Sequence, residues 1–198
     1  MQITADLVKQ LRERTGAGMM ECKRALTDVG GDLDKAVDVL RRSGAAKAEQ
    51  RAARTALEGR VDSYIHPGHR VGVLVEVNCE TDFVALTPEF GDLVRNIAMQ
   101  VAAAGAEFVR REDVPADRVD KEREIFASQL AAQGKPAALL AKIVQGKLEK
   151  FFAEVCLVEQ SYIRDDQRSV ADVVREAAAK TGENIVIRRF ARFRLGQE

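Results

Sequence analysis

Two histidines and three cysteines are the residues of this sequence that could hold a metal ion or attack a substrate. His66 and His69 flank a Pro-Gly pair, and two imidazoles at this spacing could begin a zinc site. A catalytic zinc ion normally takes three protein ligands, and no third ligand is obvious nearby in the sequence. We therefore interpret the histidine segment as an exposed turn, and we predict neither a metal site nor any other cofactor.

The cysteines form no pattern that is typical of a disulfide or a zinc site. Cys22, Cys79 and Cys156 are far apart, odd in number and in no CxxC pair, which indicates reduced thiols in an intracellular protein. Cys79 lies at the end of an expected strand, but no motif around it marks a nucleophile. An enzyme that uses Cys79 or the histidine pair remains an alternative to a binding protein, with little support from the residues.

Composition and missing motifs exclude further classes of function. The sequence has neither a GxxxxGK[ST] loop nor a GxGxxG after a strand, so it predicts no direct nucleotide binding. Lys plus Arg equals Asp plus Glu at 31 each, and aromatic residues make up 5%, which argues against a nucleic-acid partner. No apolar run could span a bilayer and the N-terminal stretch is charged, so we expect a cytoplasmic protein without a membrane partner.

Met19 and Met20 follow the glycine-rich segment 15–18 and open an expected helix. Adjacent helical positions point about 100° apart, so both side chains cannot face a narrow core stripe. Either one methionine is in the core and the other is partly exposed, or the pair offers an adaptable contact surface to a partner.

The segment Thr81-Asp82-Phe83-Val84 directly follows an expected strand. Thr81 could cap a short helical turn and leave Phe83 at its tip. A rigid aromatic beside a carboxylate on a loop would suit a protein partner. The alternative is that Phe83 folds back into the core.

Residues 1–44 are expected to form a bundle of three short helices. Apolar residues recur at helical spacing in three runs, separated by glycine-containing turns at residues 15–18 and 30–31. Thr4 and Asp32 are predicted N-caps, and Gly44 is taken as the end of the third helix. Residues 45–57 are rich in Ala, Lys and Arg, which predicts a solvated linker helix.

Residues 58–198 are expected to form an α+β core domain. Strands are predicted at residues 60–65 and 70–79, on either side of the turn 66–69, and again at residues 183–193. The last strand is expected to join the hairpin in a three-stranded antiparallel sheet. Helices are predicted at residues 89–104, 117–133, 136–160 and 169–180.

Three segments resemble signatures of the elongation factor Ts family. These segments are LVKQLRERTGAGMMECKRAL (7–26), VEVNCETDFVA (75–85) and GENIVIRRF (182–190). The resemblance covers essentially the whole chain. It implies that the helical head is a ubiquitin-associated-like (UBA-like) domain and that the remainder is the family's core domain.

The length of the chain resembles that of the short members of this family. There is room for one core subdomain and no evident coiled-coil insertion, and short members pair two copies through their sheets. A short relative carries a cysteine that bonds across the dimer, where this sequence has Ala191. The resemblance therefore implies a homodimer that is held by packing, without an intersubunit disulfide.

The resemblance also implies a partner, the translational GTPase EF-Tu, and a role as its guanine nucleotide exchange factor. The head would pack on a helix of the GTPase domain, and the second signature would insert near the Mg²⁺ site, so that GDP leaves without any bond chemistry. The residues that match these roles are Leu11, Met19 and Met20 in the head, and Thr81, Asp82, Phe83 and Val84 in the second signature.

Two other binding functions compete with this interpretation. An adaptor of another kind would bind through the head alone and would leave the TDFV segment without a role. An RNA-binding function would depend on basic residues, but zero net charge and few aromatics argue against it. Those residues are Lys47, Arg51, Arg54, Arg188, Arg189, Arg192 and Arg194.

Overall fold

The computed structural model describes residues 3–132 and 137–197. The chain divides into two compact units, which we describe separately. The first unit contains Met1–Gly59, Asn78–Phe90 and Val174–Val186, and the second contains Arg60–Val77, Gly91–Val173 and Ile187–Glu198. Each unit therefore combines segments that are far apart in the sequence.

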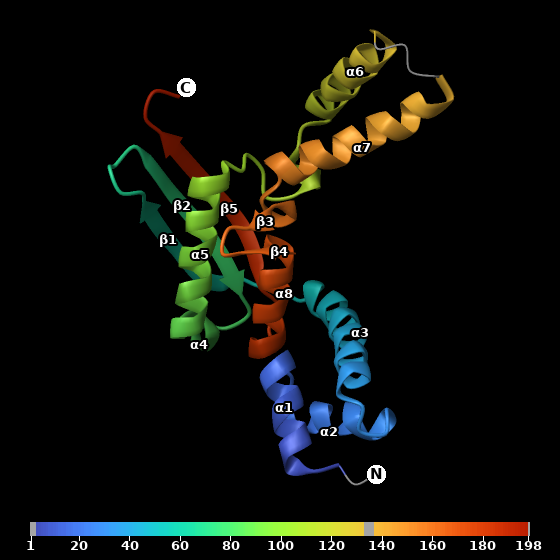
Figure 1. The fold of residues 1–198 in the computed structure, drawn as a ribbon. Helices are drawn as coiled ribbons and strands as arrows, with labels where there is room; N and C mark the ends of the chain where they lie inside the picture. The colour runs from blue at the N-terminus through green and yellow to red at the C-terminus, as the bar shows by residue number, and fades with distance from the viewer. Residues whose placement is uncertain (1–2, 133–136, 198) are drawn as a thin grey trace. The chain divides into compact units, whose positions relative to one another are not determined.

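Three helices form the head of the first unit: α1 (Ala5–Thr15), α2 (Met19–Asp28) and α3 (Leu33–Ala52) (Figure 1). The predicted N-caps are confirmed, because the Thr4 side chain accepts a hydrogen bond from Leu7 N and Asp32 accepts bonds from Asp34 N and Lys35 N. The buried core of this bundle consists of Val8, Leu11, Cys22, Ala25, Leu26 and Ala36.

The third helix differs from the prediction. It continues through Gly44 to Ala52, where we expected an end at Gly44 and a separate linker helix over residues 45–57. One glycine within a helix costs only about 1 kcal/mol relative to alanine, and the alanine-rich run that follows favours the helical state. The break at Gly44 was therefore wrong, while the division into domains at residues 44 and 57 stays a prediction.

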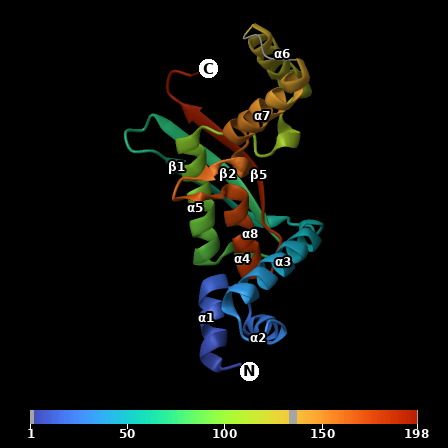
Figure 2. The ribbon, with the colours of Figure 1, turned by 45° about the vertical axis from the view of Figure 1, so that its right-hand side comes forward.

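The predicted three-stranded antiparallel sheet is confirmed. It contains β1 (Glu58–Ile65), β2 (Val71–Cys79) and β5 (Val186–Arg194), in the order β1-β2-β5. The residues between β1 and β2 form the expected turn, in which His66 N donates to Val71 O at 2.9 Å. Along β2 every second residue from Val73 to Cys79 is buried, and α5 (Pro88–Ala104) lies along this face of the sheet (Figure 2).

Two long helices, α6 (Ala116–Ala132) and α7 (Ala137–Val155), lie side by side and run in opposite directions (Figure 1). Leu130, Val144 and Leu148 are buried between them. The sequence predicted both helices but not that they would pair, because their apolar stripes fit any apolar neighbour equally well.

The predicted helix over residues 136–160 is too long at its C-terminal end. After α7 the chain forms a 3₁₀ turn, η2 (Leu157–Glu159), and then a small two-stranded sheet of β3 (Ser161–Tyr162) and β4 (Asp165–Ser169). Cys156 pairs with Phe108 in an isolated bridge, and Leu157 N donates to Phe108 O at 2.8 Å. These long-range backbone bonds end the helix. A second 3₁₀ turn, η1 (Arg111–Asp113), precedes α6, and α8 (Val170–Thr181) precedes β5.

Candidate functional site

The short helix α4 (Asp82–Ala85) presents a large apolar surface to solvent. Thr81 caps it, since the Thr81 hydroxyl accepts a hydrogen bond from Val84 N at 3.4 Å. Phe83 is 80% exposed, and Asp82 beside it is also exposed. The structure thus confirms the predicted cap and tip, and the alternative in which Phe83 folds into the core is wrong.

Leu86 is a second exposed apolar residue at this tip, and the sequence analysis missed it. It is 74% exposed, close to the value for Phe83. Residues three positions apart on a helical turn lie on the same side, so Phe83 and Leu86 form one apolar edge. Ala85, at the end of α4, and Phe90, further along the chain, are buried. The three-residue spacing of two large apolar residues was the signal that could have revealed this edge.

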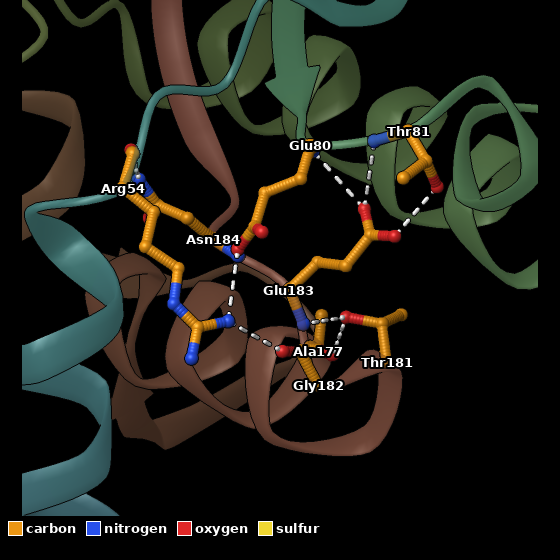
Figure 3. Close-up of polar contacts among 8 residues, drawn as sticks. All are labelled: Arg54, Glu80, Thr81, Ala177, Thr181, Gly182, Glu183 and Asn184. Carbon is orange, nitrogen blue, oxygen red and sulfur yellow. Dashed lines mark hydrogen bonds and ion pairs between the residues drawn. The ribbon is translucent and has the colours of Figure 1, made fainter.

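A carboxylate from the third family signature holds the start of α4. Glu183 Oε2 accepts hydrogen bonds from Glu80 N at 3.0 Å and Thr81 N at 3.1 Å, and Thr81 Oγ1 donates to Glu183 Oε1 at 2.6 Å (Figure 3). Two short segments about a hundred residues apart therefore meet through a single side chain. Both backbone N–H groups just before the helix and the Thr81 hydroxyl therefore find an acceptor, which holds the loop before α4 in place.

The Glu80 side chain in turn accepts a hydrogen bond from the segment that contains Glu183. Its Oε1 accepts from Asn184 N at 2.6 Å and from Arg54 Nη1 at 3.5 Å (Figure 3). Asn184 is buried, and its Nδ2 donates to Arg54 O at 2.8 Å. The backbone after α3, the loop before α4 and the segment after α8 are therefore joined within the first unit.

The end of α8 gives Glu183 its position. Gly182 has a φ of 78°, a left-handed conformation that glycine adopts without a steric penalty, and its N–H donates to Ala178 O at 3.0 Å. Thr181 Oγ1 donates to Ala177 O at 3.1 Å and accepts from Glu183 N at 3.3 Å (Figure 3). The chain thus turns sharply at Gly182 and directs the Glu183 side chain toward the start of α4.

Cys79 lies next to this cluster but is not suited to act as a nucleophile. It is fully buried, and its Sγ donates to Thr81 O at 3.1 Å. Burial raises the pKa of the Cys79 thiol, and the nearby Glu183 carboxylate raises it further. A nucleophilic thiol needs the opposite shift, so the geometry gives no support to an enzyme that uses Cys79.

The two methionines of the head are both open to solvent. Met19 is 54% exposed and Met20 is 64% exposed at the start of α2. Of the two alternatives, the one that places a methionine in the core is therefore wrong. Leu11, which the resemblance assigned to the same contact surface, has no exposed area and belongs to the core of the bundle. It supports the surface from beneath and is not part of it.

The histidine pair lies in an exposed turn, as predicted. Both side chains are open to solvent, and His66 Nδ1 lies 3.1 Å from the hydroxyl of Tyr64. Over residues 3–132 and 137–197, no group of three or more His, Cys, Asp or Glu side chains could hold a metal ion. Several of the arginines considered for RNA binding contact protein groups, for example Arg189 with Glu76 and Arg192 with Ala102 O.

The face of the sheet that α5 does not cover carries exposed apolar residues. A shallow hollow on this face is lined in part by Val61, Leu74 and Ala191. Large exposed side chains surround it. They are Val61, Ile65, Leu74 and Phe193. Among them lies the ion pair of Arg189 with Glu76, at 2.6 Å.

Comparison with known proteins gives matches that cover most or nearly all of the chain. A family model described as elongation factor TS matches residues 45–197. The elongation factor Ts of Carboxydothermus hydrogenoformans is 58% identical over 195 residues, which cover 98% of this chain and 90% of the relative. The protein of the same name from Caldanaerobacter subterraneus is 57% identical, with 98% of each chain covered. That from Anaeromyxobacter dehalogenans is 59% identical, with 99% of this chain and 90% of the relative covered.

In the part of the chain that the structure describes, each helix is too short or too polar to cross a bilayer.

Proposed function

The chain belongs to the elongation factor Ts family of translation elongation factors, and from this premise we propose that it promotes the release of GDP from the GTPase EF-Tu. The observation that carries this proposal is the exposed, firmly anchored tip of α4, with Phe83 at 80% exposure beside the Asp82 carboxylate. An exposed aromatic side chain that is already held in one position contributes binding free energy when a partner buries it.

The tip acts as a wedge at the Mg²⁺ site of EF-Tu. Mg²⁺ bridges the phosphates of a bound nucleotide to the GTPase and neutralises their charge. Phe83 enters between helices of the GTPase domain, with Thr81, Asp82 and Val84 around it, and shifts the groups that hold the ion. Because the ion and the phosphate loop hold GDP together, both contacts weaken and GDP leaves.

The head supplies binding without chemistry. Met19 and Met20 form an adaptable, exposed surface that packs on a helix of the GTPase domain. Leu11 stabilises this surface from within the core. We assign the head to the UBA-like type on the strength of the first signature and the three-helix bundle.

Thermodynamic linkage returns the exchange factor to solution. If the exchange factor weakens the binding of GDP to EF-Tu, then GDP weakens the binding of the exchange factor to EF-Tu by the same factor. Each tenfold change corresponds to about 1.4 kcal/mol. Incoming GTP therefore expels the factor. The reaction is an exchange of ligands in which no covalent bond changes, so we propose an exchange factor of the cytoplasm, where translation occurs, and not an enzyme.

We further propose that two copies pair through the open faces of their sheets. Val61, Ile65, Leu74 and Phe193 expose apolar side chains on this face, which suits a second copy with the same surface. Ala191 carries no thiol, so the pair is held by packing.

Release of a fluorescent GDP analogue from EF-Tu, in excess unlabelled GDP, tests the main proposal. We expect the protein to accelerate release, and we expect the double variant Asp82→Ala, Phe83→Ala to lose this effect. The head double variant Met19→Ala, Met20→Ala should need a higher concentration for the same rate. No acceleration by the unmodified protein would refute the proposal.

A further inference from the structure

We propose that Glu183 is the residue that positions the wedge, through a path that runs from its carboxylate to Thr81 and on to the helix that carries Phe83. This inference rests on the proposed function and names a residue outside the second signature. Glu183 itself does not lie at the exposed tip, so its effect on exchange is indirect.

The first step of the path is a single carboxylate that accepts three hydrogen bonds from the loop before α4. The Glu183 carboxylate takes the N–H groups of Glu80 and Thr81 on one oxygen and the Thr81 hydroxyl on the other, at 3.0, 3.1 and 2.6 Å. Hydrogen bonds to a carboxylate are about twice as strong as neutral ones. A neutral or shortened side chain could not satisfy all three donors in this geometry.

The second step carries this constraint into the helix. The Thr81 hydroxyl has one proton, which it donates to Glu183, and this leaves its oxygen free to accept from Val84 N at 3.4 Å. Glu183 thereby fixes the rotamer in which Thr81 can cap α4. Because α4 has only four residues, Asp82–Ala85, its geometry depends heavily on this cap.

The third step is the rigidity of Glu183 itself. The Glu183 N–H donates to Thr181 Oγ1 at 3.3 Å (Figure 3). The next residue is also fixed, because Asn184 N donates to Glu80 Oε1 at 2.6 Å. The carboxylate is therefore placed by α8 on one side and by the loop before α4 on the other. A wedge that is fixed before it meets a partner does not lose conformational freedom on insertion.

The expected consequence is a lower maximal rate of exchange with little change in binding. GDP release is followed with this protein in excess over EF-Tu, across a range of concentrations, for the unmodified chain and for Glu183→Ala and Glu183→Gln. We expect the maximal rate to fall roughly tenfold in Glu183→Ala and less in Glu183→Gln. The concentration for half the maximal rate should change by about twofold or less, since Met19 and Met20 are untouched.

A lower maximal rate with an unchanged half-maximal concentration distinguishes a positioning role of Glu183 from partial unfolding of the variant. A sample in which only some molecules are folded reaches the same maximal rate at a higher total concentration. An unchanged maximal rate for Glu183→Ala would therefore overturn the proposal. Glu124→Gln, at an exposed position of α6, is the matched control and should behave as the unmodified chain.

A double-mutant cycle with Phe83→Ala tests whether Glu183 acts through the wedge. In the Phe83→Ala background, Glu183→Ala should lower the maximal rate by about twofold or less. A full, independent loss in that background would overturn the path. Should Glu183→Ala fail to fold, Glu183→Gln and Thr81→Val take its place in the cycle. Thr81→Val keeps the shape of the side chain but removes the hydroxyl that joins Glu183 to α4.

Hydrogen exchange in the isolated protein separates this inference from the proposed function. Without the carboxylate, amides of residues 80–84 should exchange roughly tenfold faster while the unfolding temperature is largely kept. If the unmodified chain does not accelerate GDP release, the proposed function fails. Hydrogen exchange then remains as the test of whether Glu183 holds the start of α4 in place. Unchanged exchange over residues 80–84 would then overturn this inference.

Discussion

Phe83 and Leu11 are both large apolar residues of the expected contact surfaces, yet they lie at opposite extremes of exposure. Phe83 contacts mostly water, whereas Leu11 contacts only the core of the head. A residue in water contributes little to folding and much to a partner that covers it, and the reverse holds for a residue in a core. Substitutions at the two positions should therefore separate binding from stability.

Phe83→Ala should leave the free energy of unfolding within about 0.5 kcal/mol of the unmodified value, because few native contacts are lost. The same change should lower the rate of GDP release at least about tenfold if Phe83 is a hot spot of the interface. Chemical denaturation and exchange kinetics on one preparation measure both. A protein that unfolds at ordinary temperature would show that Phe83 belongs to the core.

Leu11→Ala should behave in the opposite way. It leaves a cavity in the small core of the head and should cost about 2–5 kcal/mol of stability. Met20→Ala, the matched control on the exposed surface of the same bundle, should cost less than about 0.5 kcal/mol and weaken binding to EF-Tu. Thermal unfolding and titration of EF-Tu distinguish the two variants. Equal losses of stability would contradict the exposure of Met20.

Cys156 gives a prediction for alkaline pH. Burial, together with the nearby Glu159 carboxylate, raises the pKa of its thiol to about 11, although Arg111 opposes the shift. Above the ordinary pKa of about 9 the unfolded chain loses this proton while the folded chain keeps it, so stability falls as pH rises. Denaturation at pH 8 and pH 10.5 should show a loss of about 1–3 kcal/mol that Cys156→Ala reduces. An identical slope in the variant would exclude Cys156 as the source.

At the scale of elements, local signals predicted most helices and strands. The alternation of valines in β2, the caps at Thr4 and Asp32, and the turn at residues 66–69 are all contained in a few neighbouring residues. The structure confirms each of them. Errors arose where a distant segment decides the outcome, as at Cys156, whose pairing with Phe108 ends the helix predicted through residue 160.

Gly44 was an error of another kind, since a local signal was given too much weight. It lies within α3, and a Cβ atom there would meet nothing within 4 Å. Gly44→Ala should therefore stabilise the protein by about 0.5–1 kcal/mol. Gly16→Ala is the matched control: Gly16 has a φ of 68°, and a Cβ atom would approach Lys180 Cε at 3.3 Å, so this change should destabilise. A loss of stability in Gly44→Ala would indicate a true helix end at Gly44.

At the scale of the whole molecule, the three signatures acquire a physical explanation that no single stretch of sequence contains. The first supplies the exposed methionines and the second supplies the tip with Phe83. The third contains Glu183 and Asn184, for which no local pattern predicts a role. Their hydrogen bonds to Thr81 and Glu80 span more than a hundred residues. Such pairing follows from topology, which one sequence does not determine.

The proposed dimer depends on the open face of the sheet, so a charge placed there should separate the copies. Phe193→Asp puts a carboxylate among Val61, Ile65 and Leu74, where a second copy would have to bury it unpaired. We expect the unmodified protein to sediment as a dimer at micromolar concentration, with or without reducing agent, and Phe193→Asp to sediment as a monomer. Leu139→Asp, at an exposed position of α7, should remain a dimer. A monomeric unmodified protein would refute the pairing. A Phe193→Asp monomer that retains full exchange activity would show that one copy carries the complete EF-Tu surface.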